Sequence, residues 1–332
     1  MILRMNASRF FAAAVVVLTL APRARADWLL VCNKGAHTLG IIDPEAGKQI
    51  ATVAEDGITG HEVVASADGT RAFVPIYGSG GVGSPGTDGR LLRVIDIASR
   101  KIVGTVDFGH GVRPHCAMLG PKNHHLYVTT ELDNCVTEID PEALTILGKI
   151  PTGQKESHML CISSDGRRGY TANVGPGTVS VLDMEARQLV TTISISKETQ
   201  RISISPDDRW VFTADQTASR LVVIDTSKNE VAGSIAVTAT AYGTAPTPDG
   251  HWLIAALPPA KKVAIIDIGG RKEAQTIDVP ASPQEVVVRP DGSAAYVSCS
   301  ESRQIAVIDT KTWTVSKIID ADRGADGLAW AK

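Results

Sequence analysis

Three histidines, His61, His115 and His158, occupy one place in a unit that recurs along the chain, and Gln200 occupies that place in the next unit. His115, His158 and Gln200 each stand 25 residues before an aspartate that ends a hydrophobic strand, and His61 stands 35 residues before its own. Imidazoles and an amide oxygen are ligands of Zn, Mn, Fe or Cu. If neighbouring units bring these four side chains together, they would hold a divalent transition metal with a coordination position open for substrate.

Candidate catalytic residues are predicted beside this site. Arg113, in GVRPH, would hold a carboxylate through two parallel hydrogen bonds, and Glu131 or Tyr242 would move a proton. Arg201 and Tyr77 are expected at the same end of the fold. Each of these side chains also has a plainer interpretation as a surface loop residue, in which case the histidines line a water-filled channel mouth. No cofactor other than the metal is predicted.

Internal repetition determines the predicted fold. Units of about 42 residues are filled with short alternating runs, and no stretch has sustained helical periodicity. Four antiparallel strands per unit make a propeller blade, so the sequence predicts an all-β, seven-bladed β-propeller. The C-terminal DGLAWAK aligns with the first strand of the unit and the N-terminal WLLVCN with the second, so the last strand is expected to join the N-terminal blade and close the ring. The strand-ending aspartates are Asp43, Asp96, Asp140, Asp183, Asp225, Asp267 and Asp309.

One unit is longer than the others. Its ten additional residues lie in PIYGSGGVGSPGTDGR, residues 75–90, between the second and third strands. Antiparallel pairing places this loop at the same end of the ring as the starts of the innermost strands. It is either a neutral surface insertion or a lid over the channel mouth. Glu62 follows His61 directly, so strand alternation is expected to point it away from that neighbour.

The N-terminal segment and the amino-acid composition predict localisation, partners and oligomeric state. Residues 1–26 have a basic start, an apolar core and an Ala-Arg-Ala site, which predicts a secretory signal peptide followed by a single domain over 27–332. Its removal takes four arginines from the 33 basic residues, leaving 29 against 36 acidic ones. No nucleic-acid partner and no membrane span are therefore predicted, and a monomer is expected. Five cysteines permit disulfides, with Cys116–Cys161 the first pair to test.

The repeats RGYTANVGPGTVSVLD, AAYVSCSESRQIAVID and LYVTTELDNCVTEID resemble the YVTN-repeat β-propeller family over residues 28–332. That resemblance implies an exported protein, periplasmic or secreted, and does not specify an activity. The His-His-His-Gln order is similar to that of oligogalacturonate lyase, a seven-bladed propeller that holds Mn, although the flanking repeats here differ from that family's. The resemblance implies a metal-dependent lyase, or a lactonase or other hydrolase, acting on a small acidic, sugar-derived or oligosaccharide substrate. The alternative is a non-enzymatic scaffold that displays loops to a protein or polysaccharide partner.

Overall fold

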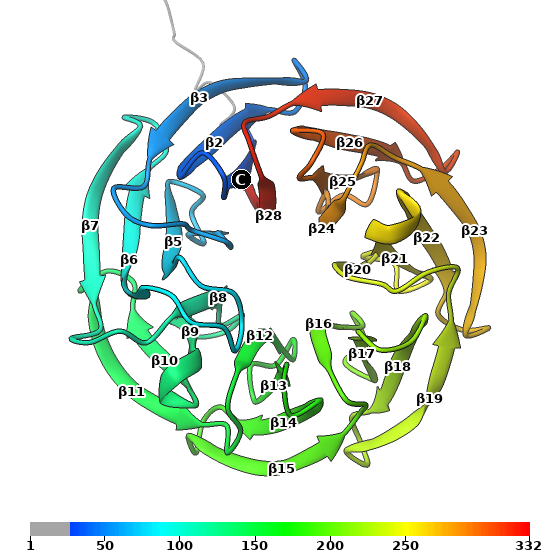
Figure 1. Ribbon diagram of the computed structural model, residues 1–332, viewed down its shortest axis with the longest axis horizontal. Coiled ribbons are helices and arrows are strands. Elements are labelled where there is room, and N and C mark those ends of the chain that lie inside the picture. The colour runs from blue at the N-terminus through cyan, green and yellow to red at the C-terminus, as the bar shows by residue number, and fades with distance from the viewer. Residues whose placement is uncertain (1–26) are drawn as a thin grey trace, which may run out of the picture.

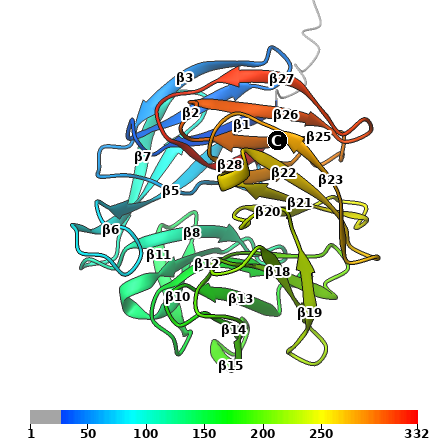
Figure 2. The ribbon, with the colours of Figure 1, turned by 45° about the vertical axis from the view of Figure 1, so that its right-hand side comes forward.

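The computed structural model describes residues 27–332, so the predicted signal peptide lies outside the described residues. Seven four-stranded antiparallel sheets stand around a common axis like the blades of a propeller (Figures 1 and 2). The predicted fold class is therefore confirmed. Within the described range, no helix is long and apolar enough to cross a membrane.

Each blade has an innermost strand beside the axis and an outermost strand at the circumference (Figure 1). Blade 1 contains β28 (Ala325–Ala331), β1 (Trp28–Asn33), β2 (Thr38–Asp43) and β3 (Lys48–Ala54). Blade 2 contains β4 (Val64–Ala65), β5 (Arg71–Gly78), β6 (Asp88–Asp96) and β7 (Lys101–Asp107). Blade 3 contains β8 (Pro114–Leu119), β9 (Leu126–Thr130), β10 (Cys135–Asp140) and β11 (Thr145–Pro151), with the short helix η1 (Glu131–Asp133) after β9. Blade 4 contains β12 (Ser157–Ile162), β13 (Arg168–Asn173), β14 (Thr178–Asp183) and β15 (Gln188–Ser194). Blade 5 contains β16 (Thr199–Ile204), β17 (Trp210–Asp215), β18 (Arg220–Asp225) and β19 (Glu230–Ala236). Blade 6 contains β20 (Thr244–Pro246), β21 (Trp252–Leu257), β22 (Lys262–Asp267) and β23 (Lys272–Asp278), with η2 (Pro258–Ala260) after β21. Blade 7 contains β24 (Pro283–Val288), β25 (Ala294–Cys299), β26 (Gln304–Asp309) and β27 (Thr314–Asp320).

The aspartates that recur in the sequence build the turns. Asp309 Oδ1 accepts hydrogen bonds from the backbone N–H groups two and three residues later, which fixes the hairpin between β26 and β27. Asp165, in the turn before β13, accepts from the Arg167 N–H and the Ser163 hydroxyl, and Gly166 follows with a positive φ of 75°. These are the turn interactions for which Asp and Gly are selected. The periodicity of the sequence therefore records where the chain reverses.

Closure of the ring joins the two ends of the described chain. β28 pairs antiparallel with β1, with Trp28 opposite Ala331 and Leu30 opposite Ala329. The predicted clasp is confirmed, and the last strand supplies the innermost position of blade 1 (Figure 1). All five cysteines are buried and unpaired, so the Cys116–Cys161 disulfide raised by the sequence is not formed.

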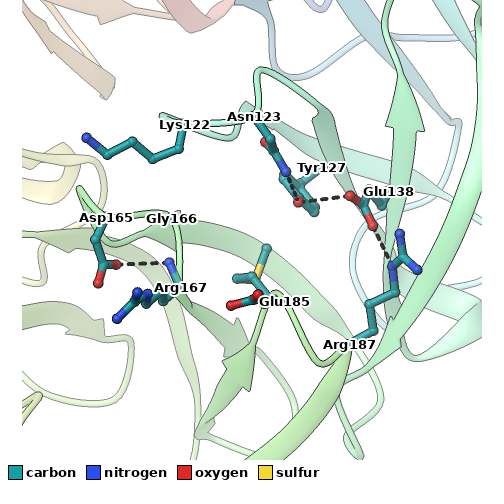
Figure 3. A pocket seen from close by; sticks show the side chains of 10 residues that line it. Lys122, Asn123, Tyr127, Glu138, Asp165, Gly166, Arg167, Glu185 and Arg187 are labelled. Atoms are coloured by element: carbon teal, nitrogen blue, oxygen red, sulfur yellow. Dashed lines mark hydrogen bonds and ion pairs between the residues drawn. The ribbon is translucent and has the colours of Figure 1, made fainter.

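The hydrophobic core is distributed between the faces of neighbouring blades. In six blades a buried aliphatic residue two positions before the strand-ending aspartate stands opposite an aromatic or aliphatic partner, as Val181 does with Tyr170. Blade 3 has Glu138 at that position, opposite Tyr127. The carboxylate receives hydrogen bonds from the Tyr127 hydroxyl at 3.1 Å and Arg187 Nε at 2.6 Å (Figure 3). Burial opposes its ionisation, but these bonds and that of His125 outweigh it and lower the pKa of Glu138.

Candidate functional site

The three histidines of the sequence pattern lie together at one end of the axis. His115 and His158 are the second residues of β8 and β12, and His61 precedes β4. Their side chains come from three consecutive blades and are 7% exposed or less. The His61 and His115 rings are 5.2 Å apart, and those of His115 and His158 stack at 3.5 Å. The sequence spacing therefore predicted a real cluster of imidazoles.

The backbone at these positions departs from regular strand geometry. Register shifts interrupt the pairing of β12 between Ser157 and Met159 and of β8 between Pro114 and Ala117. A bulge leaves one residue unpaired and turns its side chain out of the regular alternation, and bulges are frequent beside active sites. The bulges place the imidazoles of His115 and His158 toward the axis.

Tyr77 and Glu131 complete this group, which we call the His–Tyr–Glu cluster. The fully buried Tyr77 hydroxyl donates a hydrogen bond to Glu131 Oε2 at 2.7 Å, and His158 Nδ1 lies 3.3 Å from the same oxygen. Tyr77 comes from the end of β5 beside the insertion, and Glu131 begins η1. The ring of Tyr77 packs 4.7 Å from His61 and 5.3 Å from His115. In the tautomer of His158 that carries its proton on Nδ1, Glu131 Oε2 accepts that hydrogen bond and Nε2 is left as an acceptor.

Burial makes the uncharged forms of these side chains the stable ones. It lowers the pKa of His61 and His115 well below the usual histidine value, with neighbouring cations adding to the effect. Burial also lowers the pKa of His158, although Glu131 opposes the shift. Burial and the carboxylate of Glu131 raise the pKa of Tyr77. At neutral pH the cluster therefore offers neutral imidazoles and a protonated phenol.

Three polar atoms of the cluster lack hydrogen-bond partners among residues 27–332. They are His61 Nε2, His115 Nδ1 and Glu131 Oε1, and all three are buried. An unsatisfied buried polar group costs about 1–3 kcal/mol. Native proteins rarely retain several such groups in one place unless a ligand, an ion or water satisfies them.

A second group of buried charges lies across the axis and was not foreseen as a unit. Arg201 of β16, 2% exposed, donates to Glu62 at 2.6 Å and to Glu285, and Asp326 lies 3.5 Å from it. These four residues, which we call the Arg201 cluster, come from blades 5, 2, 7 and 1. The guanidinium also lies 4.5 Å from the centre of the Tyr242 ring. Burial raises the pKa of Glu62 although Arg201 opposes the shift, and it raises that of Glu285 in the same way.

Glu62 joins the Arg201 cluster, whereas its neighbour His61 joins the His–Tyr–Glu cluster. β4 begins only at Val64, so the two residues precede regular strand geometry. The side chain of Glu62 reaches Arg201 across the axis. Glu62, Arg201 and Glu285 share one place in the repeat, directly after His61, Gln200 and Gln284, and that shared place was the available signal.

Arg113 holds the insertion. Its Nε lies 2.6 Å from Asp88, and its two terminal nitrogens donate to the carbonyls of Gly81 and Ser84. The guanidinium is therefore committed to the loop, and the predicted bidentate grip on a substrate carboxylate would require these bonds to break. Strands β5 and β6 extend into the insertion, so residues 79–87 form the loop proper.

A cavity of about 450 Å³ lies between this loop and the η1 region, and Glu131 is the residue of the His–Tyr–Glu cluster that lines it. Ser84, Arg113 and Lys155 are among its lining residues, and Glu131 also lines it while remaining 1% exposed. The insertion thus forms one wall of the cavity. A volume of this size suits a small molecule.

The predicted four-residue metal site is only partly assembled. In the described part of the chain, no group of three His, Cys, Asp or Glu side chains is arranged to hold a metal ion. Two imidazoles on one ion place their ring centres well over 4 Å apart, given a metal–nitrogen distance of about 2.1 Å, whereas His115 and His158 stack at 3.5 Å. Gln200 is half-exposed, and its side chain makes no hydrogen bond within residues 27–332. As they lie, these side chains do not fit a metal ion.

Fold and site together define a seven-bladed propeller with a buried cluster of histidine, tyrosine and glutamate side chains at one end of its axis. The model of the cytochrome D1 heme domain family matches residues 120–249, which include Glu131, His158 and Arg201 but not His61 or His115. The search of curated proteins gave no match.

Two solved structures share the fold. A Kuenenia stuttgartiensis hydrazine synthase structure aligns with a TM-score of 0.64 at 20% identity, covering 76% of this chain and 77% of that one. A functionally unknown protein from Desulfotomaculum acetoxidans DSM 771 aligns with a TM-score of 0.76 at 12% identity, covering 92% and 98%. At these identities the likeness shows the propeller fold alone. The YVTN and oligogalacturonate lyase resemblances stay predictions.

Proposed function

We propose that the protein is an exported β-propeller enzyme that binds a small anionic substrate above the His–Tyr–Glu cluster and transfers a proton to or from it. The observation that carries this proposal is the set of three buried, unpartnered atoms on His61, His115 and Glu131. These atoms raise the free energy of the empty protein, and a ligand that satisfies them recovers that free energy on binding. The cluster is therefore better suited to a ligand than to stabilising the fold.

His158 has the arrangement of a general base. Glu131 holds its Nδ1 proton, so the neutral ring presents Nε2 as the proton acceptor. Tyr77, whose pKa is raised, stays protonated and serves as a hydrogen-bond donor that holds Glu131 in place. Lys155 supplies positive charge at the wall of the cavity, beside the carboxylates of Asp88 and Glu156. Abstraction of a carbon-bound proton gives lyase chemistry, and activation of water gives hydrolysis of a lactone or ester.

Access to the cluster requires the insertion to move. The five side chains are buried, and the loop at 79–87 is tied down by Arg113. In this proposal the loop is a lid, and Arg113 is a positioning residue that holds it closed. Closure excludes water and strengthens the electrostatic interactions inside.

A divalent transition metal remains a separate proposal for the same place. The unpartnered nitrogens of His61 and His115 are suitable donors, and a bound metal would supply Lewis-acid activation. Binding would require the stacked rings of His115 and His158 to separate. Metal content after exposure to Zn, Mn, Fe and Cu tests this requirement directly.

The family match also raises a heme as a cofactor. A heme iron takes an axial histidine nitrogen, and the macrocycle needs open space beside that nitrogen. His61 and His115 instead pack against Tyr77 at 4.7 and 5.3 Å, and their unpartnered nitrogens are enclosed. As arranged, these residues do not fit a heme, and no step is proposed through it.

The test compares the mature protein with His158→Ala, Glu131→Gln and the control Gln200→Ala on acidic sugars and lactones, with and without added metals. Acid–base catalysis by the cluster predicts activity that falls at least 100-fold in the first two variants and stays near the parental level in Gln200→Ala. If Gln200→Ala also loses activity along with one equivalent of metal, the four-ligand metal site replaces the proposal. If no substrate is turned over and no ligand shifts the melting temperature, the scaffold alternative holds.

A further inference from the structure

A second cavity, of about 600 Å³, lies between blades 6 and 7, away from the channel mouth. Two half-buried tryptophans wall it: Trp252, which begins β21, and Trp313, in the hairpin between β26 and β27. Their rings are 5.7 Å apart and inclined at 69°. The turn residues Asp249 and Asp291 also line the cavity, and both are exposed.

The repeating fold provides internal comparisons for this groove. Trp210 of blade 5 holds the same register position as Trp252, since each pairs with the strand-ending aspartate of its blade. Arg271 of blade 6 holds the same position as Trp313, four residues after that aspartate. Between blades 5 and 6 the Arg271 guanidinium lies 4.3 Å from the centre of the Trp210 ring. The protein thus fills that groove with its own cation.

A third groove of the same kind lies between blades 3 and 4, with a volume of about 310 Å³ (Figure 3). There the hairpin position is again an arginine, Arg187, and it is bound to Glu138. Two of the grooves therefore contain an internal guanidinium from the hairpin. The groove between blades 6 and 7 has a second indole at that position instead.

No cation of the protein takes the place of that guanidinium. In the region covered by the structure, the cation–π contacts all involve arginines, and none lies over Trp252 or Trp313. Lys311 lines the cavity, and Asp291 is paired with Arg289 Nε at 3.2 Å, so Asp249 is the rim carboxylate without a cation partner in the described chain. Asp249 uses one carboxylate oxygen for its own turn. Two indole faces with a carboxylate at the rim form the arrangement that recognises organic cations.

We propose that the groove between blades 6 and 7 binds an organic cation, a quaternary ammonium or guanidinium group, between Trp252 and Trp313. The indole faces attract the charge through their quadrupoles, and the carboxylate of Asp249 attracts it at the rim. The cation is either a free small molecule or a side chain presented by a peptide. The site is separate from the His–Tyr–Glu cluster and does not depend on the proposed enzyme activity.

Tryptophan fluorescence and calorimetric titrations of the mature protein test the proposal. The probes are tetramethylammonium, choline, its neutral isostere 3,3-dimethylbutan-1-ol, and N-acetylarginine amide. Choline is expected to bind at least tenfold more tightly than the neutral isostere. Preference for tetramethylammonium and choline identifies a free small cation, and preference for the arginine amide identifies a presented side chain. Equal binding of choline and its isostere overturns the proposal, as does binding of neither cation.

Trp313→Arg is the decisive variant. It places a guanidinium where blade 6 has Arg271, at a left-handed backbone position that arginine already occupies with φ near 49° in that blade. The protein should stay folded while cation binding falls at least tenfold, because its own side chain fills the groove. Asp249→Asn checks the rim and should weaken binding severalfold with unchanged melting temperature. A folded Trp313→Arg protein that binds choline as the parent does contradicts the proposal.

Discussion

Replacement of Arg201 by methionine removes the buried cation at the centre of three carboxyl groups, of which Asp326 alone has a second cation nearby, the partly exposed Lys34. Arg201 donates to Glu62 and Glu285 and lies 3.5 Å from Asp326, and all four side chains are buried or nearly so. Removing one partner of a buried ion pair costs about 3–5 kcal/mol, because the remaining charge is left without compensation. Methionine keeps most of the volume, so the loss reports charge rather than packing.

The loss should depend on pH with a definite sign. Burial raises the pKa of Glu62 and Glu285 above the unfolded value of about 4.5, so the folded state binds more protons than the unfolded state above that pH. Stability contributed by such groups is complete below the unfolded pKa and decreases as pH rises, by about 1.4 kcal/mol per unit for each proton. Without Arg201 the carboxyl pKa values rise further. We expect a cost of about 1 kcal/mol at pH 5 and about 3–5 kcal/mol at pH 8.

Urea unfolding at pH 5 and pH 8, followed by tryptophan fluorescence, measures this difference. Arg220→Met is the matched control, since Arg220 also pairs with a buried carboxylate, Asp215, but is itself 43% exposed. That variant should show a smaller loss that changes little between pH 5 and pH 8, because hydrogen bonds, chiefly from Arg220, lower the pKa of Asp215 despite burial, and the stability they contribute is complete above about pH 4. An Arg201→Met cost that is equal at both pH values, or below 1 kcal/mol at pH 8, would refute the reasoning.

Two further variants test the blade interface and the lid. Glu138→Val places the aliphatic residue of the other blades at this position but removes the acceptor of the buried Tyr127 hydroxyl and of Arg187, so the free energy of unfolding should fall by about 1 kcal/mol; a higher urea midpoint would contradict this. Arg113→Met breaks three bonds to the insertion, so subtilisin cleavage within 79–87 should accelerate about tenfold with little change in melting temperature. Unchanged cleavage would show that Arg113 does not hold the loop.

The fold was predictable because each blade repeats the residues that its turns require. The strand-ending aspartates and the Asp-Gly turns are local interactions, readable without knowledge of the packing. The grouping of His61, His115 and His158 followed from the same periodicity. A shared position in a cyclic repeat implies a shared distance from the axis.

The details of the site were less predictable because they depend on irregular backbone and on contacts across the axis. The contact of Glu62 with Arg201 crosses the axis and involves a residue that precedes a strand of only two residues, so alternation along that strand does not specify it. Gln200 shares the histidine position, but its neighbour Arg201 is the residue that becomes buried. The role of Arg113 depends on where the insertion folds back, which periodicity does not specify. A repeat pattern cannot predict contacts that occur in one blade alone.

The two buried clusters act on each other electrostatically. The positive charge of Arg201 adds to burial in lowering the pKa of His61 and His115, and it also opposes the effect of Glu131 on His158. The carboxyl groups around Arg201 accommodate its charge in the interior, where it would otherwise be too costly to bury. The blades without histidines thus help to keep the imidazoles neutral. It follows that Arg201→Met, beyond its effect on stability, should raise the apparent pKa of the histidines, which NMR titration of the imidazole protons would detect.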